Sequence, residues 1–211
     1  MTLDTLLQRR HLWRGGQLSP AARDTLPTGF RSLDTVLAGG WPQNALTEIL
    51  STQEGIGELR LVLPSLAHLS RGNRWITWIA PPRLPYAPAL AAAHIELSRI
   101  LLVRPRAELD ALWAIEQALR SGTCATVLAW PRQTSHRVLR RLQLAAEAGK
   151  AWGILFRHVE DAYKASPAAL RLRLESGSDG LAIQILKYRG NFAVTPTFTL
   201  PLQGGEQQEG I

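Results

Sequence analysis

A short loop around Gly55 has the glycines of a phosphate-binding loop but lacks its reactive side chains. A working loop reads Gly-x4-Gly-Lys-Ser/Thr, in which backbone N–H groups hold phosphates, the lysine reaches the β- and γ-phosphates and the hydroxyl binds Mg²⁺. Here Gly55 and Gly57 are followed by Glu58 in place of lysine and Leu59 in place of the hydroxyl. Because a carboxylate repels a triphosphate and leucine cannot ligate Mg²⁺, this vestigial loop predicts an ATPase scaffold without catalysis or cofactor.

The remaining reactive residue types suggest no other catalytic chemistry. No histidine has a partner at metal-ligand spacing, and one cysteine cannot build a zinc site. The histidines are His11, His68, His94, His136 and His158, and the cysteine is Cys124. Cys124 begins an apolar segment, which favours a buried structural thiol over a nucleophile. The sequence therefore predicts neither a metal site nor a catalytic residue.

Arginines gather at the start and along one face of a helix predicted over residues 134–148. They are Arg132, Arg137, Arg140 and Arg141. One interpretation is a solvated basic face. The other is a surface that contacts DNA phosphates or an acidic protein partner. The sequence leaves both interpretations open.

Two further segments are candidate contact surfaces. Prolines stiffen the loop over residues 81–86, and the amphipathic ring of Tyr86 would lose little entropy on docking. The alternative is that this loop packs over the former nucleotide pocket. Lys187 and Arg189 form a second basic spot, for contact with DNA or protein.

The composition indicates a globular protein with a basic surface. The chain has 211 residues, enough for one large domain, and a formal charge of +7 carried almost entirely by arginine. Such a charge favours nucleic acid or acidic protein partners, although arginine- and alanine-rich chains are also typical of GC-rich genomes. We find no secretory signal and no stretch of about 18 apolar residues, so we expect a cytoplasmic protein without a membrane partner.

Strands and helices alternate through most of the chain, which predicts an α/β fold. Strands are predicted at residues 46–50, 74–79, 100–103, 124–129 and 152–156, and helices at 28–37, 57–70, 87–94, 108–120 and 134–148. Two alternating segments, 170–174 and 181–187, are predicted to pair as half-exposed antiparallel strands. We expect a mostly parallel central sheet with helices on both faces and antiparallel C-terminal edge strands. An N-terminal helix and linker over residues 1–28 and a disordered tail over residues 203–211 would flank the domain at 29–202.

Hydrophobic spacing predicts which side chains face the core. The helix at 108–120 should direct Leu109, Leu112, Trp113 and Leu119 inward. The helix at 57–70 should direct Leu59, Leu63, Leu66 and Leu69 inward, and Pro64 should kink or shorten it. Trp41 and Trp130 are predicted to fill the former nucleotide pocket with aromatic bulk.

The segment before the vestigial loop resembles the opening of the RecA recombinase core. The resemblance is carried by Gly29-Phe30-Arg31-Ser32-Leu33-Asp34, Gly39-Gly40-Trp41-Pro42 and Thr47-Glu48-Ile49. It implies a RecA-like domain over residues 29–202. The two other segments at RecA's catalytic Glu and Mg²⁺-supporting Asp positions read Ile79-Ala80-Pro81-Pro82 and Val127-Leu128-Ala129-Trp130-Pro131, so all three parts of the ATPase site are degenerate.

Two SOS-response families built on this core, ImuA and SulA, resemble the chain more strongly. Both share the runs 55–64, 79–88, 112–124 and 166–172, while the N-terminal segment, the full opening pattern and the end at Leu186-Lys187-Tyr188-Arg189-Gly190 favour ImuA. A resemblance to ImuA implies a non-catalytic accessory protein of translesion DNA synthesis. Its partners would be a Y-family polymerase-like protein (ImuB-like), an alternative replicative-type polymerase and RecA.

Two alternatives remain. A resemblance to SulA implies a cell-division inhibitor that binds FtsZ and blocks its polymerisation. A DNA-binding module would rest on the basic charge alone.

Overall fold

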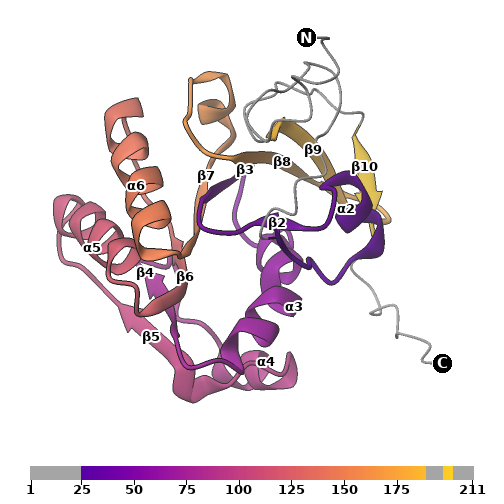
Figure 1. Ribbon diagram of the computed structural model, residues 1–211. Helices are drawn as coiled ribbons and strands as arrows, with labels where there is room; N and C mark the ends of the chain where they lie inside the picture. Colours follow the sequence, from indigo (N-terminus) through magenta and orange to yellow (C-terminus); the bar gives the residue numbers. More distant parts are fainter. Residues whose placement is uncertain (1–24, 189–196, 202–211) are drawn as a thin grey trace, which may run out of the picture.

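A twisted eight-stranded sheet forms the centre of the molecule, in the order β10-β9-β8-β3-β7-β6-β4-β5. The computed structural model describes residues 25–188 and 197–201. Neighbouring strands from β8 to β5 are all parallel, whereas β9 pairs antiparallel with both β8 and β10. Figure 1 shows this sheet running across the molecule with helices on either side. The mixed α/β fold with a mostly parallel sheet and antiparallel edge strands is therefore as predicted.

The elements follow the predicted alternation closely. The main-sheet strands are β3 (Leu46–Ser51), β4 (Trp75–Ile79), β5 (Ile100–Val103), β6 (Cys124–Ala129), β7 (Trp152–His158), β8 (Leu170–Gly177), β9 (Gly180–Tyr188) and β10 (Phe198–Leu200). The helices are α2 (Arg31–Val36), α3 (Glu58–Ser70), α4 (Ala87–Ala92), α5 (Glu108–Arg120) and α6 (His136–Gly149), with short 3-10 turns η1 (Leu97–Arg99) and η2 (Val159–Tyr163). A two-stranded ribbon of β1 (Thr25–Leu26) and β2 (Trp41–Pro42) precedes the sheet. The expected N-terminal helix, Arg189 and the expected tail lie outside the described residues.

The helices cover the two faces of the sheet in pairs. One core contains Leu61 and Leu66 of α3 and Leu90 of α4, packed with Trp78 and Ile49 of the sheet. The other core lies under α5 and α6, whose buried side chains include Ile115, Leu119, Leu139 and Leu142. Because both faces are covered, the central strands are mostly apolar, as parallel strands usually are.

The structure corrects the predicted inward faces of two helices. Leu109 and Trp113 of α5 are 79% and 64% exposed, contrary to the prediction. Leu119 is buried as predicted, Leu112 is partly buried, and Ala111 and Ile115 complete the buried stripe. This stripe packs in the core under α5 and α6, which leaves Leu109 and Trp113 on the solvent side of the helix. In α3 the fully buried side chains are Leu61, Val62 and Leu66, and the other predicted leucines are only partly buried.

Pro64 does not shorten α3, which runs unbroken from Glu58 to Ser70. Its side chain is exposed on the helix and packs against the backbone of Gly29, where an added Cβ would lie 2.4 Å from the Cβ of Pro64. Gly29 also has a φ of +85°, so glycine is required there by both space and backbone conformation.

Strand β8 is not half-exposed as predicted, because a buried ionic cluster occupies the sheet. Glu48 of β3 is fully buried and forms ion pairs with Arg157 of β7 and Arg171 of β8, the latter at 2.7 Å. Arg157 also pairs with Asp161 at 2.9 Å. Arg171 donates to three backbone carbonyls in and after η2, at 2.7–3.2 Å. The cluster therefore fastens η2 to the sheet, and Arg171 is only 4% exposed.

Lys187 lies at the edge of this cluster. Its Nζ donates a hydrogen bond to the carbonyl oxygen of Ser166 at 2.7 Å. Burial, together with the nearby Arg171 charge, lowers the pKa of Lys187 below its usual value, while Glu48 acts in the opposite direction. Because the folded protein binds this proton less tightly than the unfolded chain, its contribution to stability rises as pH climbs from the lowered pKa to the ordinary lysine range.

Candidate functional site

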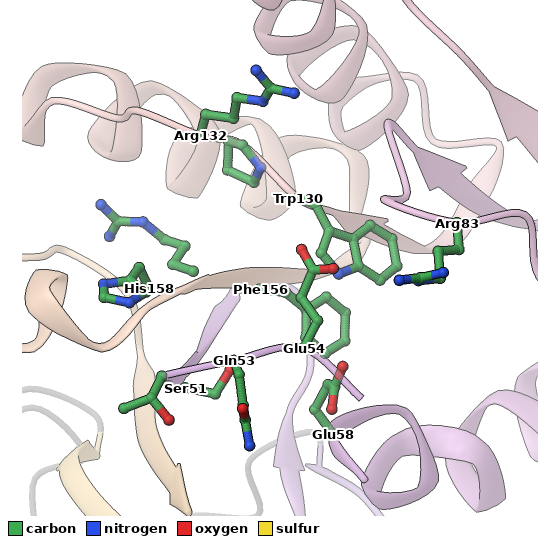
Figure 2. Close-up of a pocket in the computed structure, with 12 residues that line it drawn as sticks. Ser51, Gln53, Glu54, Glu58, Arg83, Trp130, Arg132, Phe156 and His158 are labelled. Carbon is green, nitrogen blue, oxygen red and sulfur yellow. The ribbon is translucent and has the colours of Figure 1, made fainter. Parts of the chain in front are cut away.

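The vestigial loop opens into a pocket at the carboxyl ends of the central strands. This loop pocket measures about 600 Å³ and is lined by residues 51–54 at the end of β3, residues 130–132 after β6 and the end of β7. Arg83 and Glu58 lie at its sides. Figure 2 shows Arg83 and Glu54 extending toward Trp130 from opposite sides of the pocket. Open parallel sheets bind their ligands at this end of their strands, so the location is that of a binding site.

Glu58 binds the backbone of its own loop. Its carboxylate accepts hydrogen bonds from the backbone N–H of Gly55 at 2.8 Å and of Gly57 at 3.1 Å. Gly57 precedes α3 with a φ of +113°, and Glu58 is 6% exposed. An internal carboxylate thus satisfies two backbone donors at the start of α3. Sequence reasoning identified Glu58 as a repulsive charge but missed that it serves as the acceptor of the loop.

Aromatic side chains close the inner end of the pocket. Trp130 stacks on Phe156 with ring centroids 4.6 Å apart and on Trp78 with centroids 5.6 Å apart. Trp41, by contrast, does not line the pocket: it is fully buried against Trp152 and donates to the hydroxyl of Ser65 at 3.0 Å. Of the two tryptophans predicted to fill the pocket, the structure places only Trp130 there.

Replacing Glu58 with alanine should lower the free energy of unfolding by about 1–3 kcal/mol, because two backbone N–H groups lose a largely buried acceptor. Hydrogen exchange at the amides of Gly55 and Gly57 should accelerate in the variant, and urea denaturation would measure the stability. Glu54→Ala is the matched control, since Glu54 is exposed in the same loop. Unchanged exchange at both glycines in Glu58→Ala would contradict the assigned role of the carboxylate.

The basic residues predicted around α6 divide into two groups. Arg141 pairs with Glu116 of α5, which also pairs with Arg120 at 2.9 Å, so Arg141 joins the two helices. Arg132, Arg137 and Arg140 are exposed, and Arg132 lines the loop pocket. Helix α6 begins as predicted after Ser135, whose hydroxyl accepts a hydrogen bond from the N–H of Val138. The basic face is therefore present but smaller than its sequence suggests.

The other two predicted contact surfaces differ in accessibility. Tyr86 is 72% exposed and Leu84 is 63% exposed on the proline-rich loop after β4. Ala80 begins this loop with a φ of +52°, an uncommon backbone conformation for a residue other than glycine. Lys187 is half-buried and bonded to Ser166, so the structure does not bring it to a free basic surface.

An apolar sheet edge was missed at the sequence level. Leu101 and Leu102 of β5 are 43% and 37% exposed, and β5 has no strand on its outer side among the described residues. Leu97, just before β5, is also exposed. We call these three residues the β5 edge. The strand over residues 100–103 was predicted without a position in the sheet, because a short apolar run does not distinguish a central strand from an edge strand.

Residues 25–188 and 197–201 have neither of two further features, a metal-binding cluster or a membrane-spanning helix. Within these ranges His, Cys, Asp and Glu side chains form no cluster of three that could hold a metal ion. None of the helices there combines the length and the apolar character that crossing a membrane requires.

Comparison with known protein families, with individual relatives and with solved structures identifies the same family each time. The family model described as "Cell division inhibitor SulA" matches residues 45–153, just over half of the chain. This segment extends from the residue before β3 to the second residue of β7 and includes the vestigial loop and the β5 edge.

Individual relatives have the same description. The chain is 29% identical over 117 residues to the cell division inhibitor SulA of Yersinia pestis (strain Pestoides F), covering 56% of this chain and 70% of that protein. The SulA of Yersinia pseudotuberculosis serotype O:1b matches to the same extent. The crystal structure of SulA from Pseudomonas aeruginosa has 33% sequence identity and a TM-score of 0.45, covering 53% of this chain and 97% of that chain.

Proposed function

This chain belongs to the SulA family of cell division inhibitors, and we propose on that premise that it blocks bacterial cell division by binding FtsZ. FtsZ is the partner that the resemblance to SulA implies, and inhibition after DNA damage, within the SOS response, is the corresponding physiological setting. The match of the family model over residues 45–153 is the observation that carries this proposal.

The comparisons correct the function expected from the sequence. A resemblance to ImuA predicted an accessory protein of translesion DNA synthesis with a Y-family polymerase-like partner. The matching family model and the curated relatives are SulA, so this prediction is wrong. The shared runs in the sequence are common to both families, and the features that favoured ImuA lie largely outside residues 45–153.

The proposed inhibitor acts by binding and not by catalysis. The backbone donors of the vestigial loop are already bonded to Glu58, which supports the absence of ATP hydrolysis. A RecA-like core over residues 29–202 remains part of the proposal. It is supported by the opening pattern, in which Asp34 accepts a hydrogen bond from the N–H of Thr28 at 2.8 Å and Leu33 is fully buried.

The β5 edge is the surface that we assign to partner contact. An unpaired strand offers backbone donors and acceptors to another chain, and exposed apolar side chains beside it add buried area on docking. The edge lies inside the segment that matches the family model. Arg99, at the end of η1 beside this edge, adds a half-buried positive charge.

The first test is whether the purified full chain stops FtsZ assembly. We expect stoichiometric amounts to suppress FtsZ polymerisation, measured by light scattering and sedimentation, and expression in cells to produce filaments. FtsZ that assembles normally in a molar excess of folded chain would overturn the proposal.

Replacing Leu102 with aspartate should weaken this inhibition about tenfold or more, because a charge would replace apolar surface at a contact worth over 1.4 kcal/mol. Leu144→Asp on α6 is the control. Leu144 is also exposed, at 51%, and α6 contacts β3 and β7, which are separated from β5 by β6 and β4. Circular dichroism melting should show both variants folded. Equal potency of the two variants would exclude the β5 edge as the contact surface.

A further inference from the structure

A second concave surface lies away from the loop pocket, between α3 and the end of α4. It has a volume of about 650 Å³ and also receives the start of α2 and the last residues of β10. We call it the α3–α4 groove. Apolar side chains form its floor and walls, including Phe30, Leu63, Pro64 and Leu200. This size suits one or two large apolar side chains of a bound segment.

The charges around the α3–α4 groove are of one sign. Arg60 and Arg71 line it beside His94, and none of the described residues that line it is acidic. The loop pocket differs, because Glu54 and Glu58 line it beside its arginines. The Arg71 side chain is exposed and makes no hydrogen bond or ion pair with any residue in the described ranges. The groove therefore complements an apolar segment that carries carboxylates.

The groove is held in its shape by the fold. Gly29, at a φ of +85°, lets the chain pass directly against Pro64 of α3. On the opposite wall, His94 ends the turn after α4 with a φ of +60°, uncommon outside glycine. Its neighbour Ile95 is buried and bonds back to Leu90. A preformed groove of this kind requires little reorganisation when a partner binds.

We propose that the α3–α4 groove is a second anchor for the division partner and takes an apolar side chain flanked by carboxylates on that protein. This inference rests on the proposed function, since FtsZ is the partner in question. A chain with a formal charge of +7 is suited to an acidic partner. Carboxylates of the bound segment pair with Arg71 at the rim, and its apolar side chain fills the groove between Leu63 and Leu200.

The test is FtsZ binding by isothermal titration calorimetry, with variants of the full chain. Arg71→Glu reverses the rim charge, and Ala92→Trp places a large side chain at an exposed lining position. Each should weaken binding about tenfold or more, and Arg71→Lys should restore most of the affinity lost in Arg71→Glu. Lys150→Glu, at the exposed end of α6, makes the same charge change outside the groove and should leave affinity unchanged.

The outcomes separate this proposal from the proposed function. Full-strength FtsZ binding by both Arg71→Glu and Ala92→Trp would overturn the groove as an anchor and leave the division-inhibitor function standing. A wild-type chain that does not bind FtsZ would instead overturn the proposed function itself. The chain's own acidic segment is the competing occupant. If a Glu206→Lys, Glu209→Lys double variant bound FtsZ tenfold more tightly, the groove would be assigned to that segment and the partner proposal would fail.

Discussion

Replacing Glu48 with glutamine should lower the free energy of unfolding by about 3–5 kcal/mol, because two buried guanidinium groups would lose their shared carboxylate. Glu48 is fully buried, and the side chains of Arg157 and Arg171 are 2% and 5% exposed. Among the described residues the Nε of Arg157 has no hydrogen-bond partner, and Asp161 would remain as the carboxylate paired with this side chain. Urea denaturation followed by circular dichroism would measure the effect.

Two companion variants make the Glu48 experiment specific. Glu175→Gln removes a carboxylate that pairs with Arg173 at 2.6 Å near the surface, and it should cost less than about 1 kcal/mol. A triple change of Glu48 to leucine and of both arginines to methionine should recover only part of the stability. Matched apolar side chains avoid the desolvation of charge, but the three carbonyls that Arg171 bonds would lose their donor. A loss below about 1 kcal/mol in Glu48→Gln would show that the cluster is not an energetic unit.

The Trp41→Ala variant should lose about 3–5 kcal/mol of stability, the usual effect of deleting a buried aromatic side chain. Trp41 is fully buried, stacks on Trp152 at a centroid distance of 5.3 Å and donates to Ser65. The hydroxyl of Ser65 in turn donates to the carbonyl of Pro27 at 2.8 Å, so the loss also loosens the chain before α2.

Trp113→Ala is the matched control for this second experiment. Trp113 is 64% exposed on α5, and its removal should change the free energy of unfolding by less than about 0.5 kcal/mol. Guanidinium denaturation of both variants with the same probe would compare them directly. Similar losses from the two tryptophans would contradict the packing described for the core under α3.

Most of the architecture could be predicted because its signals are local. Apolar runs at strand spacing, a serine cap before α6 and glycines at the loop each act within a few residues. The alternating segments 170–174 and 181–187 correctly indicated the antiparallel pair β8–β9. The helix faces were less predictable, since Leu109 and Trp113 have the same spacing as a core stripe. Only the packing of α5 against the sheet and α6 decides which stripe is buried.

The ionic cluster illustrates what sequence spacing cannot reach. Glu48 stands within an otherwise apolar strand, and Arg171 alternates with leucines as an outward residue would. Their contact joins residues 123 positions apart and requires β3 to lie beside β8. A lone carboxylate inside a buried strand was the available signal, and it called for a buried cationic partner elsewhere in the chain.

The same cluster bears on whether the family-matching segment is a separable module. The match ends at residue 153, whereas Arg157 and Arg171 both lie beyond it. A fragment cut there would keep the carboxylate of Glu48 in the interior with neither counter-ion. It would also leave β3 without β8 on one side and without nearly all of β7 on the other. The C-terminal hairpin is therefore no dispensable appendage of an inhibitor domain. Any truncation or domain fusion of this protein has to keep the family-matching segment and the C-terminal hairpin in one piece.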